Sequence, residues 1–221
     1  MSVHLQREIE RLKKQLLSLC ALAEEQVQLA VQALLERDPD TAQRVEQRDV
    51  EIDHREVEVE EECLKTLALH QPVASDLRLI VAALKINSDL ERIGDLAVNI
   101  ARKAAAFASQ GPMEIPFDLA GMWEKTQLML RDSLDALVNL NPALATSVCA
   151  RDNEVDQMKR QIRHTAEDIM QRDPAKVPAL LTLLAVSRNL ERVADHATNI
   201  AEDVIYMAEG RIIRHGNGEA L

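Results

Sequence analysis

Apolar residues recur every three or four positions along most of this chain, which is the spacing of one face of an α-helix. The segment from Ile86 to Ile100 is typical, with Leu90, Ile93 and Ala97 completing an apolar stripe. Charged and polar residues fill the positions between the apolar ones. This pattern predicts long amphipathic helices, each burying one stripe against its neighbours.

Proline and glycine divide the pattern into six segments. Proline is tolerated in the first turn of a helix, and the residue before it resists the helical conformation, so each X-Pro pair marks a boundary. Such pairs occur at Asp38-Pro39, Gln71-Pro72, Gly111-Pro112, Asn141-Pro142 and Asp173-Pro174. The connections are short, so consecutive helices should be antiparallel neighbours. The expected helices are 3–37, 39–70, 74–110, 118–140, 142–172 and 176–209.

The second half of the chain repeats the first. LERIGDLAVNIA at 90–101 returns as LERVADHATNIA at 190–201, and RDVEID at 48–53 returns as RDNEVD at 151–156. A repeat of this length is the mark of a duplicated structural unit. The sequence therefore predicts an all-α fold of two tandem three-helix bundles, six long antiparallel helices related by internal pseudo-twofold symmetry. We expect the first bundle at 1–111 and the second at 112–221.

Composition and charge narrow the class of protein. Apolar residues make up 47% of the chain, aromatic residues only 2%, and the formal net charge is -11. An acidic chain is a poor partner for nucleic acid, whose phosphates require a basic surface. Three cysteines without CxxC spacing are typical of reduced packing thiols in a cytosolic protein. The start of the chain is charged, unlike a signal peptide, and no apolar run reaches the length of a transmembrane segment.

Acidic residues are matched across the predicted hairpins. Glu91 and Asp95 are four residues apart, so they lie on one face of their helix. Asp53 and Glu91 each lie nineteen residues from Pro72, and Asp49 and Asp95 each lie twenty-three residues from it. If the chain folds back near Pro72, these four carboxylates fall at one level. The second half repeats the match about the Asp173-Pro174 turn with Asp152, Asp156, Glu191 and Asp195.

Four carboxylates at one level repel one another and lose solvation if they are buried without partners. A bound cation removes that cost, and paired acids from facing helices are the usual ligands of metal sites in helical bundles. Oxygen ligands suit hard ions such as magnesium, calcium, manganese or ferric iron, whereas zinc normally brings histidine or cysteine. The alternative interpretation is that the acids simply form a solvated polar face.

Five neighbouring residues are weaker candidates. His54 and His196 each follow a motif acid and therefore point away from the acidic face, which favours a surface or packing role. Asn99 and Asn199 are candidates for outer ligands, and equally for a plain interhelical hydrogen bond. Asp203 continues the second acidic row without an acidic counterpart in the first half, so the two sites need not be identical.

The repeated ERxxDxxxNIA phrase, the RDxxxD phrases and the six-helix length resemble the PhoU family of bacterial phosphate-transport accessory and regulatory proteins. The resemblance covers about residues 3–209. It implies two three-helix bundles in which E(D)xxxD motifs hold multinuclear clusters of iron or zinc, with magnesium or manganese as further possibilities. By this resemblance one cluster would be held by Asp49, Asp53, Glu91 and Asp95, and the other by Asp152, Asp156, Glu191 and Asp195.

The resemblance also implies a function. Members of the family act in the cytoplasm as negative regulators of phosphate uptake and of the phosphate-starvation regulon. They are thought to connect the ATPase subunit of the phosphate ABC transporter with a membrane sensor histidine kinase, which implies peripheral recruitment to membrane complexes. A homodimer is also an expectation for this chain.

Two other classes of function are the alternatives. A carboxylate-bridged metalloenzyme would carry ExxH motifs, and no motif acid here is followed by histidine at i+3. The chain also contains no Gly-rich phosphate loop, and no nucleophile is paired with a base, so we expect no enzymatic activity. The remaining alternative is a metal-free helical adaptor or scaffold whose acids face water or a basic partner.

Overall fold

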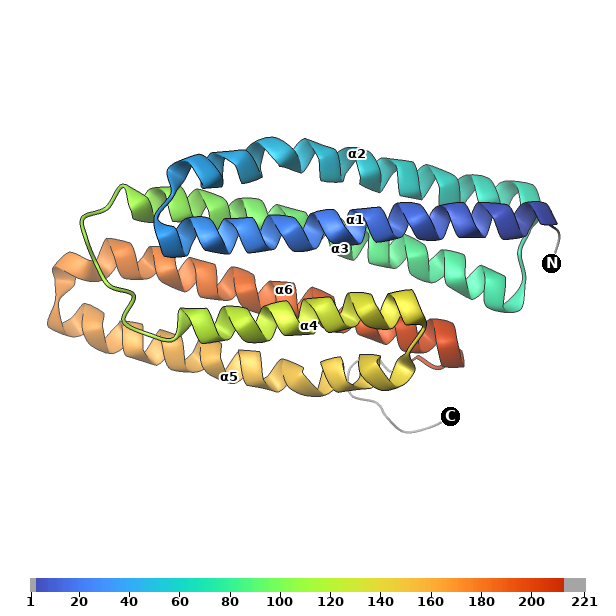
Figure 1. The fold of residues 1–221 in the computed structure, drawn as a ribbon. Helices are drawn as coiled ribbons and strands as arrows, with labels where there is room; N and C mark the ends of the chain where they lie inside the picture. The colour runs from blue at the N-terminus through green and yellow to red at the C-terminus, as the bar shows by residue number, and fades with distance from the viewer. Residues whose placement is uncertain (1–2, 213–221) are drawn as a thin grey trace.

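The computed structural model describes residues 3–212 and contains six α-helices and one short 3₁₀ turn in that range (Figure 1). The prediction of six helices is confirmed, and every predicted helix end lies within two residues of the observed one. The elements are α1 (Val3–Glu36), α2 (Pro39–His70), α3 (Ala74–Ala108), α4 (Leu119–Asn139), α5 (Pro142–Arg172), η1 (Pro174–Lys176) and α6 (Val177–Glu209).

The six helices form two three-helix bundles that pack side by side. Helices α1 to α3 make the first bundle and α4 to α6 make the second, and α3 packs against α6 as extensively as against α1. Helices α2, α3, α6 and α5 therefore follow one another as a layer, and α1 and α4 cover one face of it (Figure 1). The other face of this layer carries no further helix from the described residues.

Capping residues explain where the second helix of each bundle begins. The Asp38 carboxylate accepts hydrogen bonds from the backbone N–H groups of Asp40 (2.9 Å) and Thr41 (3.2 Å). The Asn141 side chain accepts one from Leu144 at 3.1 Å. A proline follows each cap and already has the helical φ angle. Such caps contribute about 1 kcal/mol each to helix stability.

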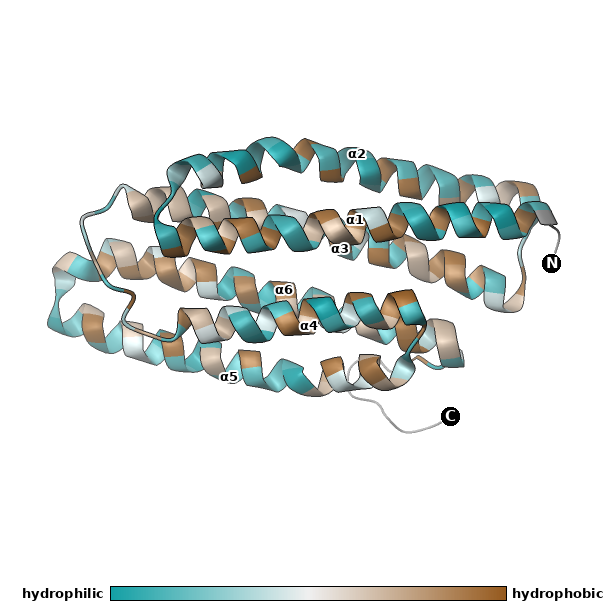
Figure 2. Ribbon diagram, in the orientation of Figure 1, coloured by the Kyte–Doolittle hydropathy of each residue, from teal (hydrophilic) through white to brown (hydrophobic). Residues whose placement is uncertain are grey.

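The core is aliphatic and is supplied chiefly by α1, α3 and α6. In α3 the residues Ile86, Leu90, Ile93, Ala97 and Ile100 are all fully buried, which confirms the stripe expected from the sequence. Figure 2 shows hydrophilic and apolar residues alternating along the helices, with hydrophilic residues prevailing on α2. Because α3 and α6 contact both their own bundle and each other, a polar side chain on them is either at the helix–helix seam or on the open face.

The segment between the bundles is held by Arg37. Its guanidinium donates to the backbone carbonyl of Met113 at 2.7 Å, and at 3.4 Å to the carbonyls of Phe107, Gln110 and Gly111. It also stacks 4.1 Å from the centre of the Phe107 ring. One side chain at the end of α1 thus satisfies the carbonyl groups of a connection that lacks regular secondary structure.

Candidate functional site

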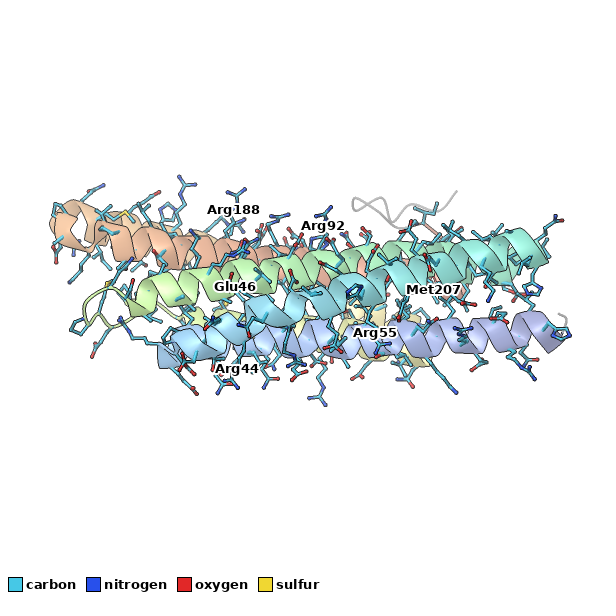
Figure 3. All side chains as sticks on the ribbon, turned by 90° about the horizontal axis from the view of Figure 1, so that it is seen from above. Arg44, Glu46, Arg55, Arg92, Arg188 and Met207 are labelled. Carbon is cyan, nitrogen blue, oxygen red and sulfur yellow. The ribbon has the colours of Figure 1, made fainter. Side chains whose placement is uncertain are left out.

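The structure brings the first four predicted acids to the contact between α2 and α3. We call Asp49, Asp53, Glu91 and Asp95 the first quartet; Asp53 is exposed and the other three are half-buried. Arg92 pairs with both acids of α3, at 3.4 Å from Glu91 and 3.1 Å from Asp95. Figure 3 shows Arg92 projecting on the side away from α1, so these acids lie on the open face of the layer.

The acids of the two helices act on one another electrostatically. Burial raises the pKa of the Asp49 carboxyl, and the negative charges of Asp53 and Asp95 raise it further. Burial also raises the pKa of Glu91, followed by the charge of Asp95 and, more weakly, that of Asp53. Acids of α2 thus raise the pKa of acids on α3 and the reverse, so the charges of the two helices are close enough to repel one another across the hairpin.

Gly94 allows the two helices to approach closely at this level. A Cβ atom added to Gly94 would lie 2.9 Å from Cδ1 of Ile52 and 3.5 Å from Oδ1 of Asp49. The first of these distances is shorter than side chains tolerate. The absence of a side chain therefore lets Ile52 pack directly against α3, with Asp49 at ordinary contact distance beside it.

The second quartet lies at the equivalent contact between α5 and α6. It consists of Asp152, Asp156, Glu191 and Asp195. Burial, followed by the charges of Glu191, Asp152 and Asp156, raises the pKa of Asp195 to about 6. The pKa of Asp152 is raised by burial, then by Asp156 and more weakly by Glu191, while the Thr198 hydroxyl donates to it at 3.3 Å and opposes the shift.

Lys159 distinguishes the second quartet from the first. Its ammonium nitrogen lies 2.5 Å from Oε1 of Glu191 on α6 and 3.8 Å from Oδ1 of Asp156 on α5. A positive charge of the protein itself therefore sits between acids of both helices. Sequence reasoning missed this residue, although the RDxxxD repeat places it three residues after Asp156 in the second copy and Glu56 at the matching place in the first.

Glu56 adds a further negative charge beside the first quartet, where the second quartet has the positive charge of Lys159. Burial raises the pKa of Glu56, and the charges of Glu60 and Asp53 raise it further. The only cation that pairs with the first quartet in the described residues is Arg92, which is 56% exposed and stays on its own helix. An exposed pair of this kind stabilises little. The first quartet thus keeps a larger uncompensated negative charge.

His196 and Asn199 link the two bundles and do not face the second quartet. Nδ1 of His196 lies 2.7 Å from Oδ1 of Asp89 on α3, and the amide of Asn199 donates to the same oxygen at 3.2 Å. The packing role expected for His196 and the interhelical hydrogen bond expected as one role of Asn199 are what the structure contains. Asp89 was not singled out from the sequence, because its partners lie more than a hundred residues away.

The remaining candidate residues do not join the acids of either quartet. Asp203 is buried and pairs with the ammonium group of Lys85 on α3 at 3.1 Å, so it bridges the bundles as well. His54 and Asn99 are exposed. The structure therefore adds none of these side chains to a quartet as a metal ligand: His54, His196, Asn99 or Asn199.

Within residues 3–212, no group of three or more His, Cys, Asp or Glu side chains is arranged so that it would hold a metal ion as it stands. The chemistry of the quartets nevertheless fits a hard cation, since they offer carboxylate oxygens from two helices. In the second quartet the Lys159 ammonium already occupies a place between two of these carboxylates. Metal binding would require the quartet side chains to turn, and it stays a prediction.

Known proteins resemble this chain along both bundles. The family model described as "PhoU domain" matches residues 16–104 and again 119–204. The PhoU homolog of Pseudomonas putida, named a phosphate-specific transport system accessory protein, is 38% identical over 209 residues, covering 94% of this chain and 82% of the relative. The PhoU protein of Escherichia coli strain K12, with the same description, is 34% identical over 214 residues, covering 97% and 89%.

Two crystal structures share the fold. PhoU from Pseudomonas aeruginosa superposes with a TM-score of 0.90 at 38% identity, over 93% of this chain and 99% of that one. The phosphate transport system regulatory protein PhoU from Streptococcus pneumoniae gives a TM-score of 0.83 at 28% identity, over 94% and 98%. In the part of the chain that the structure describes, no helix combines the length and apolar character needed to cross a bilayer.

Proposed function

Since the chain belongs to the PhoU family, we propose that it is an accessory protein of phosphate transport that restrains phosphate uptake and represses the phosphate-starvation regulon. The observation that carries this proposal is the match of both bundles to the family, in sequence and in fold, along nearly the whole described chain. Its relatives are named as accessory proteins of the phosphate-specific transport system and not as enzymes.

In this function the protein acts in the cytoplasm as an adaptor between two membrane complexes. One partner is the ATPase subunit of the phosphate ABC transporter, and the other is the sensor histidine kinase of the phosphate response. An adaptor changes the state of a kinase only if it binds the two states with unequal affinity. A rigid bundle with a broad open face, made by α2, α3, α6 and α5, is a suitable surface for such selective contacts.

The quartets are the proposed cation sites of this adaptor. Asp49, Asp53, Glu91 and Asp95 would hold the first ion or cluster, iron or zinc by the expectation of the family, or else magnesium or manganese. The second would be held by Asp152, Asp156, Glu191 and Asp195. A bound cation supplies positive charge that relieves the repulsion between the carboxylates and ties two helices together.

Deletion of the gene tests the regulatory function. In the organism that carries it, loss of the protein should leave phosphate-starvation genes expressed when phosphate is plentiful, and the intact gene supplied on a plasmid should restore repression. A reporter of starvation expression, together with uptake of labelled phosphate, provides the readout. Normal repression in the deletion strain at high phosphate would contradict the proposal.

A further inference from the structure

An open groove of about 520 Å³ lies beside the second quartet, between α5 and α6. Four of the side chains that line it are cationic and two are anionic, in a chain whose net charge is -11. Leu184 and Ser187 complete the wall between the charged residues. The charged residues are Lys159, Arg163, Arg188, Arg192, Glu167 and Glu191.

Two of the cations make no ion pair with any residue that the structure describes. Lys159 pairs with Glu191 at 2.5 Å, and Arg163 pairs with Glu167 at 2.7 Å. Among the described residues, neither Arg188 nor Arg192 makes an ion pair, although both are exposed. They are four residues apart and so lie one turn apart on the same face of α6. Figure 3 shows Arg188 projecting outwards from the open face of the layer.

The basic character of the groove is not inherited from the duplicated scaffold. The repeat aligns α5 with α2 through the RDxxxD phrases and α6 with α3 through the ERxxDxxxNIA phrases. At the places of Lys159 and Arg163 the first bundle has Glu56 and Glu60, and at the place of Arg188 it has Ser88. Three positions that are acidic or neutral in one bundle are therefore cationic in the other. Only Arg192 has a cationic counterpart, Arg92.

We propose that this groove binds an acidic segment of a partner protein, a stretch whose carboxylates meet Arg188 and Arg192 and whose backbone lies along the α5–α6 hairpin. The cations are spread along two helices over at least one turn, which suits a ligand with several carboxylates. A single small anion would need donors that converge on one point. This proposal rests on the proposed adaptor function in one respect, which is that the protein has a protein partner.

The charge of the whole molecule makes this match specific. A chain with net charge -11 repels acidic proteins at long range, so an acidic segment gains binding energy only where cations are gathered and unpaired. The acidic α2–α3 hairpin, with Glu56 and Glu60 at the matching positions, would reject the same segment. The two similar bundles would therefore bind an asymmetric partner in one orientation.

A peptide-binding experiment tests the proposal. The probe is a fluorescein-labelled helical peptide with a glutamate at every fourth position along one face. Its binding is compared by fluorescence anisotropy with that of the same peptide carrying glutamine at these positions. Chelator is present throughout, so the result does not depend on a bound metal. We expect the intact protein to bind the glutamate peptide at least about tenfold more tightly than the glutamine peptide, with affinity falling as salt is added.

Charge reversal in the groove should weaken binding. The double variant Arg188→Glu/Arg192→Glu should lose about tenfold in affinity, and Arg188→Gln/Arg192→Gln should lose about threefold, since exposed charge pairs are individually weak. The matched control is Lys14→Glu/Arg131→Glu, which changes the net charge equally at exposed cations of α1 and α4 that lie outside the groove. It should stay within about twofold of the intact protein. Circular dichroism confirms that each variant is folded.

Three results would overturn the proposal. The first is equal affinity of the intact protein for the two peptides, and the second is an equal loss of peptide affinity in the control variant. The third is that the intact protein self-associates in sedimentation and that Arg188→Glu/Arg192→Glu abolishes this self-association. The last would make a second copy of this chain the occupant. None of these results would affect the phenotype of the deletion strain. The proposal about the groove and the proposed regulatory function are therefore tested separately.

Discussion

At the scale of single residues, the acids were predictable and their cationic neighbour was not. Counting from Pro72 places four carboxylates at one level because a tight antiparallel hairpin fixes the register of its helices. The position of the Lys159 ammonium depends on the rotamers of a long, flexible side chain, and it reaches across from α5 to Glu191 on α6. Comparison of the repeats shows the exchange of Glu56 for Lys159, but not the contact that results.

Removing Lys159 should strengthen cation binding at the second quartet. In Lys159→Met the internal positive charge disappears while most of the side-chain volume remains, so a metal ion no longer competes with it. We expect the affinity of the second quartet for Mn²⁺ to rise about tenfold, the effect of one nearby unit charge at a partly exposed site. Isothermal titration calorimetry of the metal-free protein measures this change.

The control for this variant is Lys125→Met. Lys125 is an exposed lysine that pairs at 2.5 Å with Glu154, outside both quartets. Its removal changes the net charge by the same amount and should leave Mn²⁺ affinity nearly unchanged. Equal affinities in Lys159→Met and the intact protein would show that Lys159 does not occupy a cation position.

The cysteines give a pH-dependent prediction at the same scale. Cys20 and Cys63 are buried free thiols and Cys149 is half-buried, in accord with the packing role expected from the sequence. Burial, with the charges of Glu202 and Asp152, raises the pKa of Cys149 to about 11. A raised pKa keeps the thiol protonated over more of the pH range, so reactivity should appear only as the pH approaches that value.

Alkylation of Cys149 by iodoacetamide at pH 8 should therefore be about a hundredfold slower in the folded protein than in urea, because the thiolate is correspondingly scarce. Between pH 8 and pH 10 the rate in the folded protein should rise about tenfold for each pH unit, following the thiolate fraction. Mass spectrometry of the peptide that contains Cys149 gives both rates. A rate in the folded protein that levels off near pH 9 would contradict the raised pKa.

At the scale of helices, the two acid-bearing hairpins solve the same packing problem with different side chains. In the first bundle Ile52 of α2 faces Gly94 of α3, and in the second the repeat places Val155 opposite Ala194. Relative to the first bundle, the second has one carbon atom fewer on α5 and one carbon atom more on α6 at this contact. The sequence predicts the hairpins from their apolar spacing, but this compensation appears only when the distance between Gly94 and Ile52 is known.

Gly94→Ala should destabilise the first hairpin. The added Cβ would lie 2.9 Å from Cδ1 of Ile52, a fully buried side chain that has little room to move. Overpacking a core destabilises the folded state by about 1–3 kcal/mol. The higher helix propensity of alanine relative to glycine offsets roughly 0.8–1 kcal/mol of this loss. The net expectation is a loss of about 1 kcal/mol in the free energy of unfolding, measured by urea titration.

The double variant Ile52→Val/Gly94→Ala reproduces the side chains of the second bundle and removes the clashing Cδ1 atom. It should recover stability to within about 0.5 kcal/mol of the intact protein, a favourable coupling between two destabilising changes. Ile52→Val alone should cost about 1 kcal/mol because it leaves a small cavity. Additive losses in the double variant would show that the contact does not set the distance between α2 and α3.

At the scale of the whole molecule, the sequence predicts two bundles but not how they meet. Helix ends and duplication are local signals of proline, capping residues and apolar spacing. The seam between α3 and α6 depends on partners far apart in the chain, such as Lys85 with Asp203 and Asp89 with His196. The positions equivalent to Lys85 and Asp203 are Ala185 and Lys103, so the pseudo-twofold symmetry does not repeat this ion pair.

The extensive seam predicts that both bundles unfold together. Fluorescence of Trp123, in α4, and hydrogen exchange of α2 should report the same urea midpoint. Asp203→Asn should lower that midpoint for both probes, because it leaves the Lys85 ammonium without its carboxylate at a partly buried contact, at a cost of about 1–3 kcal/mol. Two separate transitions, with only the second bundle affected, would show that the bundles are independent domains.

If each quartet holds cations, as we propose, the metal content of the protein after equilibrium dialysis depends on the quartet carboxylates. Element analysis would compare the intact protein with Asp49→Asn/Asp95→Asn, with Asp152→Asn/Asp195→Asn, and with the control Asp135→Asn/Asp168→Asn at exposed acids outside the quartets. We expect each quartet variant to lose its own share of metal, the first variant the larger share, and the control to lose none. Metal content that is the same in all four proteins would contradict this proposal.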